Sequence, residues 1–142
     1  MLANQVKNEG ILKNFITLNN LIQKEINDIL KESPINYLEY SILMYANQNA
    51  VTQYKISKEY DISPQRINQF INNLEKHNFI EKEDDKVNGR AAKKILVTRS
   101  GKKILREVNN EIIERIEDKK ILPETLELLN VNLKLVIAGL SK

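Results

Sequence analysis

Apolar residues recur at steps of three and four along both ends of the chain, and this spacing predicts long amphipathic helices. The first helix is predicted over Asn4 to Glu32, where Ser33 and Pro34 end it. A second is predicted from a cap at Ser100 or Thr98 to about Lys120. A third opens at Pro123. Their predicted apolar stripes are Ile11, Phe15, Leu18, Ile22, Ile26 and Ile29; then Ile104 or Leu105, Val108, Ile112 and Ile116; then Leu126, Leu129, Leu133, Val136 and Leu140.

Shorter helices are predicted in the middle of the chain from their capping residues. Asn36 precedes Glu39 by three positions, which is the spacing of a capping box. The helix that follows is expected to reach Asn47 and to bury Leu38, Ile42, Leu43 and Ala46. Thr52 is expected to cap a short helix that runs through Ile56 to Tyr60.

After a tight connection, 61–63, the sequence predicts another helix. Ser63 is its expected N-cap and Pro64 its first residue. Asn78 marks its end, because asparagine tolerates the left-handed conformation that usually requires glycine.

A β-hairpin is predicted after this helix. The stretches 79–83 and 93–98 alternate apolar with polar residues and flank DDKVNGRAA, which contains the turn-forming pair Asn88 and Gly89. The acidic stretch EKEDD, 81–85, is expected to be a solvated turn at the base of the hairpin. A carboxylate site for a divalent ion in that stretch is the alternative interpretation.

The helix that begins ISPQRINQFINNL has two sharply different faces. With about 100° per residue, Phe70, Ile71 and Leu74 fall close to Ile67 on one side. The opposite arc contains only polar residues: Gln65, Arg66, Asn68, Gln69, Asn72, Asn73 and Lys76. Such a face suits the reading of DNA, because Arg pairs with guanine and Asn or Gln with adenine. The alternative is that Asn and Gln, which are common throughout this chain, merely fill solvent positions.

The neighbours of this helix favour the first interpretation. A short helix and a three-residue turn precede it, which is the spacing of a helix-turn-helix, and a basic hairpin follows. The predicted fold class is therefore mainly α with a small β-hairpin wing, a winged helix-turn-helix flanked by N- and C-terminal helices. At 142 residues one structural domain is expected, made of regions 1–34, 35–99 and 100–142.

Charge is distributed unevenly along the chain. The formal net charge is only +3, but from Thr52 to Arg106 we count 13 Lys or Arg against 7 Asp or Glu, an excess of +6. The stretch from Lys86 to Arg106 has eight basic residues and no acid. This asymmetry predicts an anionic partner, although a solvated basic face is the alternative.

Several function classes find no support in the sequence. It has no cysteine and a single histidine, His77, which argues against disulfides, thiol redox sensing and a thiolate or imidazole metal site. We find no phosphate-binding glycine loop and no nucleophile-histidine pair, so we predict neither an enzyme nor a cofactor. No apolar run approaches 18 residues and no secretory signal is visible, which predicts a cytoplasmic protein without membrane contact.

Four short motifs resemble the MarR family of bacterial winged-helix regulators. INYLEYSIL is similar to the start of the family's second helix, and TQYKISKEYDIS to the first helix of its helix-turn-helix. SPQRINQFINNLEKHNFIEK resembles the recognition helix and its exit into the wing. ILVTRSGKKIL resembles the entry into the dimerisation helix, with Thr98 and Gly101 in the family's Thr-x-x-Gly positions.

The resemblance implies a homodimeric regulator of transcription, most often a repressor, that binds a pseudo-palindromic double-stranded DNA operator. Each protomer would place the recognition helix, 64–77, in a major groove and the wing, 84–92, in the adjoining minor groove. The expected base-reading residues are Pro64, Gln65, Arg66, Asn68 and Gln69. Expected contacts to the DNA backbone come from Thr52, Gln53, Ser63, Asn72, Asn73, Lys93 and Lys94, and wing contacts from Lys86, Asn88 and Arg90. The expected dimer contacts are Ile11, Phe15, Leu18, Ile22, Leu126, Leu129, Leu133 and Val136.

The sequence departs from the family pattern in the wing. The family usually has Asp-x-Arg, whereas this chain has Asn88-Gly89-Arg90, with one extra residue before Thr98. Without the carboxylate, Arg90 lacks the usual brace for its guanidinium. Asp61 and Asn78 stand where glycine is common, and both residue types tolerate a left-handed backbone.

Two further expectations remain open at this point. Family members often respond to a small ligand, and Tyr37, Tyr40, Tyr45, Phe15 and Phe70 could line its pocket or could simply fill the core. The alternative function is a winged-helix protein-interaction module, such as an antagonist of a related regulator, that does not read DNA.

Overall fold

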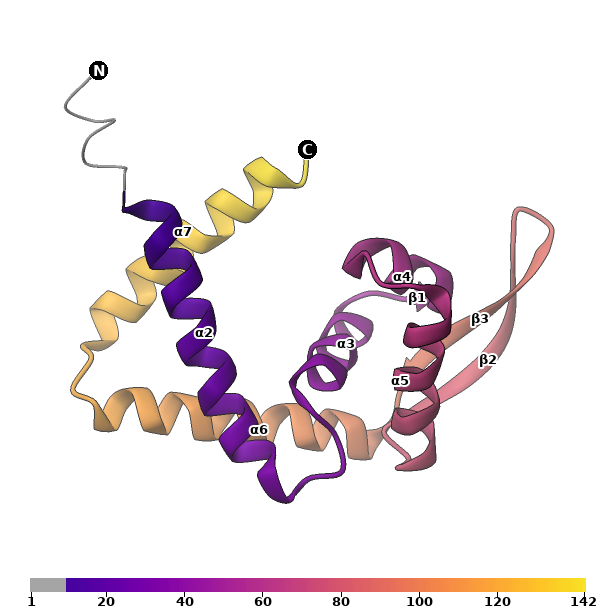
Figure 1. Ribbon diagram of the computed structural model, residues 1–142, viewed down its shortest axis with the longest axis horizontal. Helices are drawn as coiled ribbons and strands as arrows, with labels where there is room; N and C mark the ends of the chain where they lie inside the picture. Colours follow the sequence, from indigo (N-terminus) through magenta and orange to yellow (C-terminus); the bar gives the residue numbers. More distant parts are fainter. Residues whose placement is uncertain (1–9) are drawn as a thin grey trace. The chain divides into compact units, whose positions relative to one another are not determined.

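The computed structural model describes residues 10–142, so the predicted helical residues 4–9 lie outside the described part of the chain. Figure 1 shows the order of the elements. They are α2 (Ile11–Ile29), the 3-10 turn η1 (Leu30–Glu32), α3 (Tyr37–Gln48), β1 (Val51–Thr52), α4 (Gln53–Tyr60), α5 (Pro64–Lys76), β2 (Ile80–Val87), β3 (Arg90–Val97), α6 (Arg99–Asp118) and α7 (Pro123–Leu140). The described chain forms two compact units, one ending at Val108 and one running from Asn109 to Lys142.

The predicted caps of the central helices are confirmed. At the start of α3, the Asn36 side chain accepts a hydrogen bond from the Glu39 backbone, and the Glu39 carboxylate accepts one from the Asn36 backbone. Thr52 caps α4 by accepting from the backbone nitrogen of Lys55, and Ser63 caps α5. These bonds satisfy donors that the first turn of a helix leaves free.

The turn between α4 and α5 is compact because its polar groups are bonded internally. Asp61 has φ 50, the left-handed conformation expected for it. The Ile62 backbone nitrogen donates to the Ser57 carbonyl over 3.2 Å, and the Ser57 hydroxyl donates to the Ile62 carbonyl over 2.7 Å. Asn78 is also left-handed after α5, with φ 63, as predicted.

The hairpin is longer than predicted and belongs to a three-stranded antiparallel sheet of order β1-β3-β2. Residues 81–85 are paired within β2, so the predicted solvated turn is wrong. Asn88 and Gly89 both have positive φ, 54 and 78, and alone form the turn. A two-residue turn of this kind matches the twist of paired strands, which allows pairing to continue up to Val87 and Arg90. The two-residue strand β1, paired with β3, was not predicted.

The core of the first unit lies where the central helices meet the sheet. Its fully buried side chains are Ile42, Leu43, Val51, Ile56, Ile67, Ile71, Leu74, Ile80 and Ile95. Burial of each such side chain stabilises the fold by roughly 1.5–3 kcal/mol. This core fixes α4 and α5 against the base of the hairpin.

Thr98 and Gly101 join the hairpin to α6. Of the two predicted caps, the structure selects Thr98, whose hydroxyl oxygen accepts from the Gly101 nitrogen and donates to the Asn78 carbonyl. A Cβ atom on Gly101 would lie 2.3 Å from the Phe79 carbonyl oxygen and 2.8 Å from a Val97 methyl. The position therefore requires glycine, because the strand and the helix touch there.

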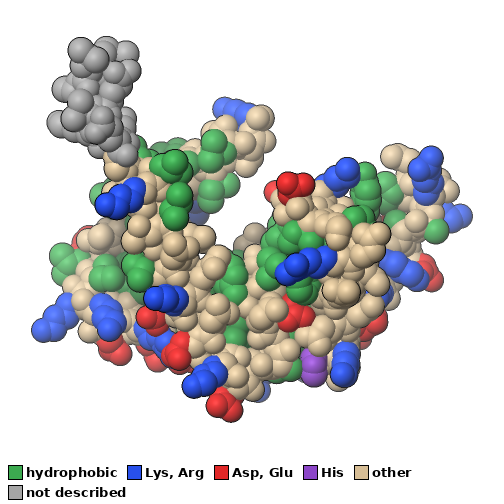
Figure 2. Space-filling model, viewed as in Figure 1, with side chains coloured by type: hydrophobic (Ala, Val, Ile, Leu, Met, Phe, Trp, Pro, Cys, Tyr) green, Lys and Arg blue, Asp and Glu red, His purple; other side chains and the backbone are tan. Residues whose placement is uncertain are grey.

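The second unit, Asn109–Lys142, contains the C-terminal half of α6 and the whole of α7. Lys120, with φ 62, ends the turn after α6, and Pro123 opens α7 as predicted. None of the α7 side chains is buried, and Leu135 is 67% exposed. Figure 2 shows hydrophobic side chains at the surface over the C-terminal end of α7. Among the described residues, no helix has the length and apolarity needed to cross a bilayer.

Candidate nucleic-acid interface

The outer face of α5 is open to solvent, as the helical wheel predicts. Gln65, Arg66, Asn68 and Gln69 are exposed, while the intervening Ile67 is fully buried. The helix thus presents a row of long polar side chains above a rigid apolar base. Such a row can meet the edges of base pairs, whose donors and acceptors line the major groove.

Two of these side chains are oriented by neighbours. The Arg66 guanidinium carbon lies 5.4 Å from the centre of the Phe70 ring, a cation-π contact that holds the side chain along the helix. The Gln53 side-chain nitrogen, Nε2, donates to the Asn68 side-chain oxygen, Oδ1, over 2.9 Å, and this bond connects α4 to α5. Sequence reasoning placed both residues of this pair at the interface but did not predict the bond between them.

Asn72 connects α5 to the wing. Its side-chain oxygen accepts a hydrogen bond of 2.6 Å from the Lys82 ammonium on β2, which also lies 3.7 Å from Glu75. Asn72 remains exposed at the edge of the face. The helix α5 and the hairpin are therefore joined by polar contacts as well as by the core.

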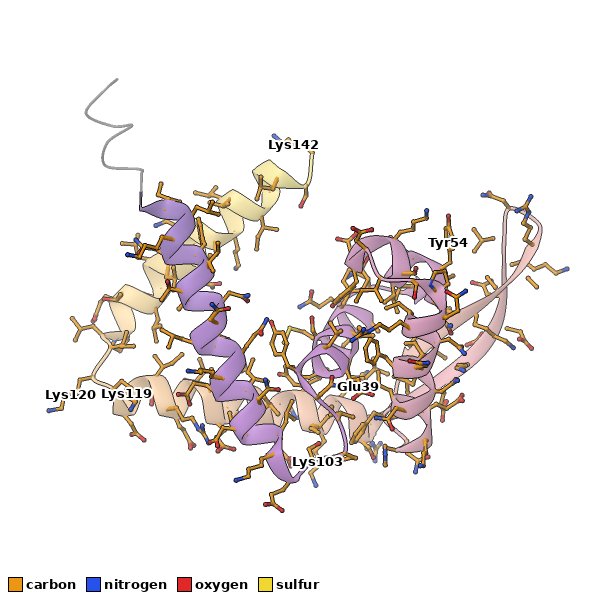
Figure 3. All side chains as sticks on the ribbon, viewed as in Figure 1. Glu39, Tyr54, Lys103, Lys119, Lys120 and Lys142 are labelled. Atoms are coloured by element: carbon orange, nitrogen blue, oxygen red, sulfur yellow. The ribbon has the colours of Figure 1, made fainter. Side chains whose placement is uncertain are left out.

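Asn73 differs from the other polar residues of the wheel, and its assignment to an entirely outward face is wrong. Its amide nitrogen donates to the Glu39 carboxylate over 2.6 Å and to the Pro34 carbonyl over 3.2 Å. Glu39 is only 5% exposed and lies where α3 comes beside α5 (Figure 3). The wheel misplaced Asn73 because it considers one helix alone, whereas α3 packs against that side of α5.

The wing has charged side chains on both of its faces. Side chains alternate along β3, so Lys93 and Lys94 project from opposite faces of the hairpin. The Lys93 ammonium forms an ion pair with the Asp84 carboxylate across the strands. Lys94 lies on the face of its cross-strand neighbour Glu83.

The tip of the wing is exposed and has a defined backbone. Arg90 is exposed at the last paired position of β3, and Lys86 is exposed one position before the end of β2. Asn88 occupies the left-handed first position of the turn. Asn88 therefore has a conformational role that aspartate could also fill. The structure explains Asn88 by its left-handed backbone conformation and not by a hydrogen bond to Arg90.

An open groove of about 910 Å³ separates the starts of α4 and α5 from the wing. Its lining combines the polar helix residues with the wing charges: Gln53, Tyr54, Pro64, Asn68, Lys82, Asp84, Asp85, Lys86, Ala91, Ala92 and Lys93. Tyr54 is 65% exposed, projects from α4 (Figure 3), and has the Lys58 ammonium 5.4 Å from its ring centre. Sequence reasoning missed Tyr54, although a lone aromatic among polar residues at a helix start was the available signal.

The family comparison matches this same part of the chain. The sequence model described as MarR family matches residues 35–92, from the residue before the α3 cap to β3 of the wing. Over residues 35–92 the chain is therefore similar to the MarR family. A search among curated proteins finds no match.

Solved structures of MarR-family proteins have the same fold. MarR from E. coli is 15% identical with a TM-score of 0.71, and the match covers 87% of this chain and 93% of that one. A MepR variant from a multidrug resistant S. aureus clinical isolate is 21% identical with a TM-score of 0.73, covering 92% and 96%. FabT of Streptococcus pneumoniae, solved in complex with DNA, is 20% identical with a TM-score of 0.66, covering 92% and 95%.

Outside residues 35–92, the residues predicted to form a dimer lie on faces left open within each unit. On α2, Ile11, Phe15 and Leu18 are exposed and Ile22 is half-buried. On α7, Leu126 and Leu133 are half-buried, whereas Leu129 and Val136 are exposed. Each helix therefore retains an apolar face that its own unit does not cover.

The aromatic residues predicted as a possible ligand pocket have several different surroundings. Tyr40 is buried and its hydroxyl donates to the Leu105 carbonyl over 3.3 Å. The Tyr45 ring packs edge-to-face on Tyr60, with centroids 5.9 Å apart. Burial raises the pKa of the Tyr40 and Tyr60 hydroxyls. Of these three tyrosines, Tyr40 belongs to the buried core, whereas Tyr45 and Tyr60 are half-buried. Within the described residues, no group of three His, Asp or Glu side chains is placed to hold a metal ion.

Proposed function

We propose that this protein is a homodimeric regulator of transcription that recognises a pseudo-palindromic sequence in double-stranded DNA. The single observation that supports this most strongly is the exposed polar row of α5 beside a groove edged by wing lysines. A polar helix face alone would be an ordinary surface. Its combination with a flanking wing that has Lys86 and Arg90 exposed near its tip matches the two grooves that a winged helix contacts.

In this proposal α5 enters the major groove. Its 13 residues span about 20 Å, enough to cross a groove about 12 Å wide. Arg66 would fork onto guanine, with Gln65, Asn68 and Gln69 at neighbouring base pairs. Thr52 and Ser63, at the starts of α4 and α5, would add backbone contacts, because helix N-termini attract phosphate.

The wing would meet the neighbouring minor groove. Arg90 at its tip would enter that groove, where the narrow walls concentrate negative potential. Lys86 and Lys93 would neutralise phosphates on the way. Lys94 would contact DNA only where the backbone bends around the other face of the hairpin.

The exposed faces of α2 and α7 support a dimer. Each has large apolar side chains that one protomer leaves in water, and contiguous patches of this kind mark interfaces. A twofold dimer would place its reading helices about 34–36 Å apart, one turn of DNA. Repression, a cytoplasmic location and release by a small ligand belong to the same proposal, on family resemblance.

The test is selection of duplexes from a random pool with the purified protein, followed by salt titration of the best sequence. We expect specific binding with a Kd of about 10⁻⁸–10⁻¹¹ M at physiological salt. Arg66→Ala should lose about 1–3 kcal/mol, and only for sequences with the preferred base. Lys86→Ala should weaken every sequence, whereas the control Lys31→Ala, an exposed lysine of η1, should have no effect. If no sequence is enriched, the protein-interaction alternative gains and the proposal fails.

A further inference from the structure

We propose that Gln53 determines which base Asn68 prefers, by fixing the direction in which the Asn68 amide faces DNA. This inference rests on the proposed function, because it concerns how α5 reads a base. It assigns Gln53 a positioning role in specificity rather than only a contact to the phosphate backbone. The observation behind it is the hydrogen bond of 2.9 Å from Gln53 Nε2 to Asn68 Oδ1.

Both residues are fixed where they meet. Gln53 is the first residue of α4, next to the cap Thr52, which is itself paired with β3. Asn68 follows Ile67, a fully buried residue of α5. The backbones of the two helices therefore cannot drift apart without disturbing the core, and the side chains of Gln53 and Asn68 both line the groove that separates the helices from the wing.

In this bond the Asn68 amide has one of its two orientations. An asparagine side chain has one acceptor oxygen and one donor nitrogen. With Oδ1 turned to Gln53, Nδ2 is the group on the other side, and no other hydrogen bond of these two amides is formed with residues 10–142. The free amino group is the one that can face a base edge.

A free donor selects acceptors in the major groove. Guanine offers N7 and O6, adenine offers N7, and thymine offers O4, whereas the cytosine edge offers a donor. An untethered asparagine would instead use both of its groups on adenine N7 and N6. We therefore expect guanine, adenine or thymine to be accepted, and cytosine to be disfavoured, at the base that Asn68 meets.

Glutamate at position 53 reverses this polarity. A carboxylate only accepts hydrogen bonds, so in Gln53→Glu the Asn68 amide must turn Nδ2 toward residue 53 and present Oδ1 outward. An outward acceptor prefers the amino groups of adenine or cytosine. The fold should tolerate this change, because a negative charge is favourable at the start of a helix.

The experiment measures binding of the full chain to a set of duplexes in which each base pair of the selected half-site is varied. In Gln53→Glu, one base pair per half-site should change its preferred base by about 5- to 150-fold, the equivalent of 1–3 kcal/mol. The added charge weakens all duplexes alike, so it cancels in the ratio of two sequences. Gln53→Met, which has similar size but no hydrogen bond, should reduce the preference at that base pair toward equality.

The Asn68→Ala background provides the matched control. If Gln53 acts through Asn68, adding Gln53→Glu to Asn68→Ala should change no base preference. A change of preference in that background would mean that Gln53 reads the base itself, and would overturn the inference. Equal weakening of all sequences by both Gln53 variants would also overturn it. If the unaltered protein selects no sequence, the proposed function fails first, so the two failures are distinguishable.

Discussion

Replacement of Asn73 by alanine should destabilise the fold rather than weaken a contact to DNA. The Glu39 carboxylate is nearly inaccessible to water and has two partners, the Asn36 backbone nitrogen at 3.0 Å and the Asn73 amide at 2.6 Å. The same Asn73 nitrogen reaches the Pro34 carbonyl at 3.2 Å. Asn73→Ala would remove one oxygen's partner and leave the capping box of α3 with a poorly satisfied carboxylate.

The size of the effect follows from these contacts. A hydrogen bond to a charged group contributes about 1.5–3 kcal/mol, and an unsatisfied buried acceptor costs about 1–3 kcal/mol. Because Asn73 itself is half-exposed, water can partly replace it, and we expect a loss of about 1–2 kcal/mol. For a chain of this size each kcal/mol lowers Tm by roughly 2–4 °C. Tm should therefore fall by about 2–8 °C.

Asn72→Ala is the matched control, since the neighbouring asparagine is exposed and bonded only to Lys82 among the described residues. Its effect on stability should stay within about 0.5 kcal/mol. Thermal unfolding followed by circular dichroism at equal protein concentration measures both, with DNA affinity measured well below the transitions. The structural role would be refuted if Asn73→Ala had the Tm of the unaltered protein but lost DNA affinity for every sequence. That result would instead favour the predicted contact of Asn73 with the DNA backbone.

Three other substitutions test the fold and the wing. Burial raises the pKa of the Tyr40 hydroxyl above its usual value near 10. The stability that the neutral hydroxyl contributes is therefore complete below about pH 10 and is lost as the pH rises through the raised pKa. Tyr40→Phe should make the alkaline fall in Tm shallower. Gly101→Ala would push a methyl against the Phe79 carbonyl and should cost about 1–3 kcal/mol in denaturant unfolding; an unchanged midpoint would contradict the close approach. Asp84→Asn should free Lys93 for phosphate, raising affinity for all sequences and steepening the log-log salt dependence by about 0.9; unaltered salt dependence would show that Lys93 does not contact DNA.

Much of the fold was predictable because its signals are local. Helix caps depend on residues three positions apart, so Asn36, Thr52 and Ser63 could be identified from the sequence alone. The choice between Thr98 and Ser100 could not, because Thr98 is favoured by a bond to the distant carbonyl of Asn78. The limit of prediction lies where a side chain has a partner far away in sequence.

The hairpin illustrates the same limit in a strand. The first predicted strand ended at residue 83, and the charged residues 81–85 were expected to be a solvated turn at the base of the hairpin. They pair because the Asn88-Gly89 turn brings β3 alongside, and the exposed strand needs no apolar face to continue. The strand β1 is too short for any periodic pattern, and it exists only because Val51 and Thr52 meet Ile95 and Lys94.

The amide side chains of α5 show how tertiary partners divide residues that composition treats as equivalent. Asn73 is bonded into the scaffold through Glu39, and Asn72 is tied to the wing. Asn68 is oriented by Gln53 but keeps its amino group for a partner. Gln65 and Gln69, for which no hydrogen bond within residues 10–142 is found, retain both donor and acceptor. In the proposed function, α5 therefore offers a narrower surface for base reading than its sequence suggested. Asn72 and Asn73 fix the position of the helix. Gln65, Gln69 and the amino group of Asn68 would face the bases.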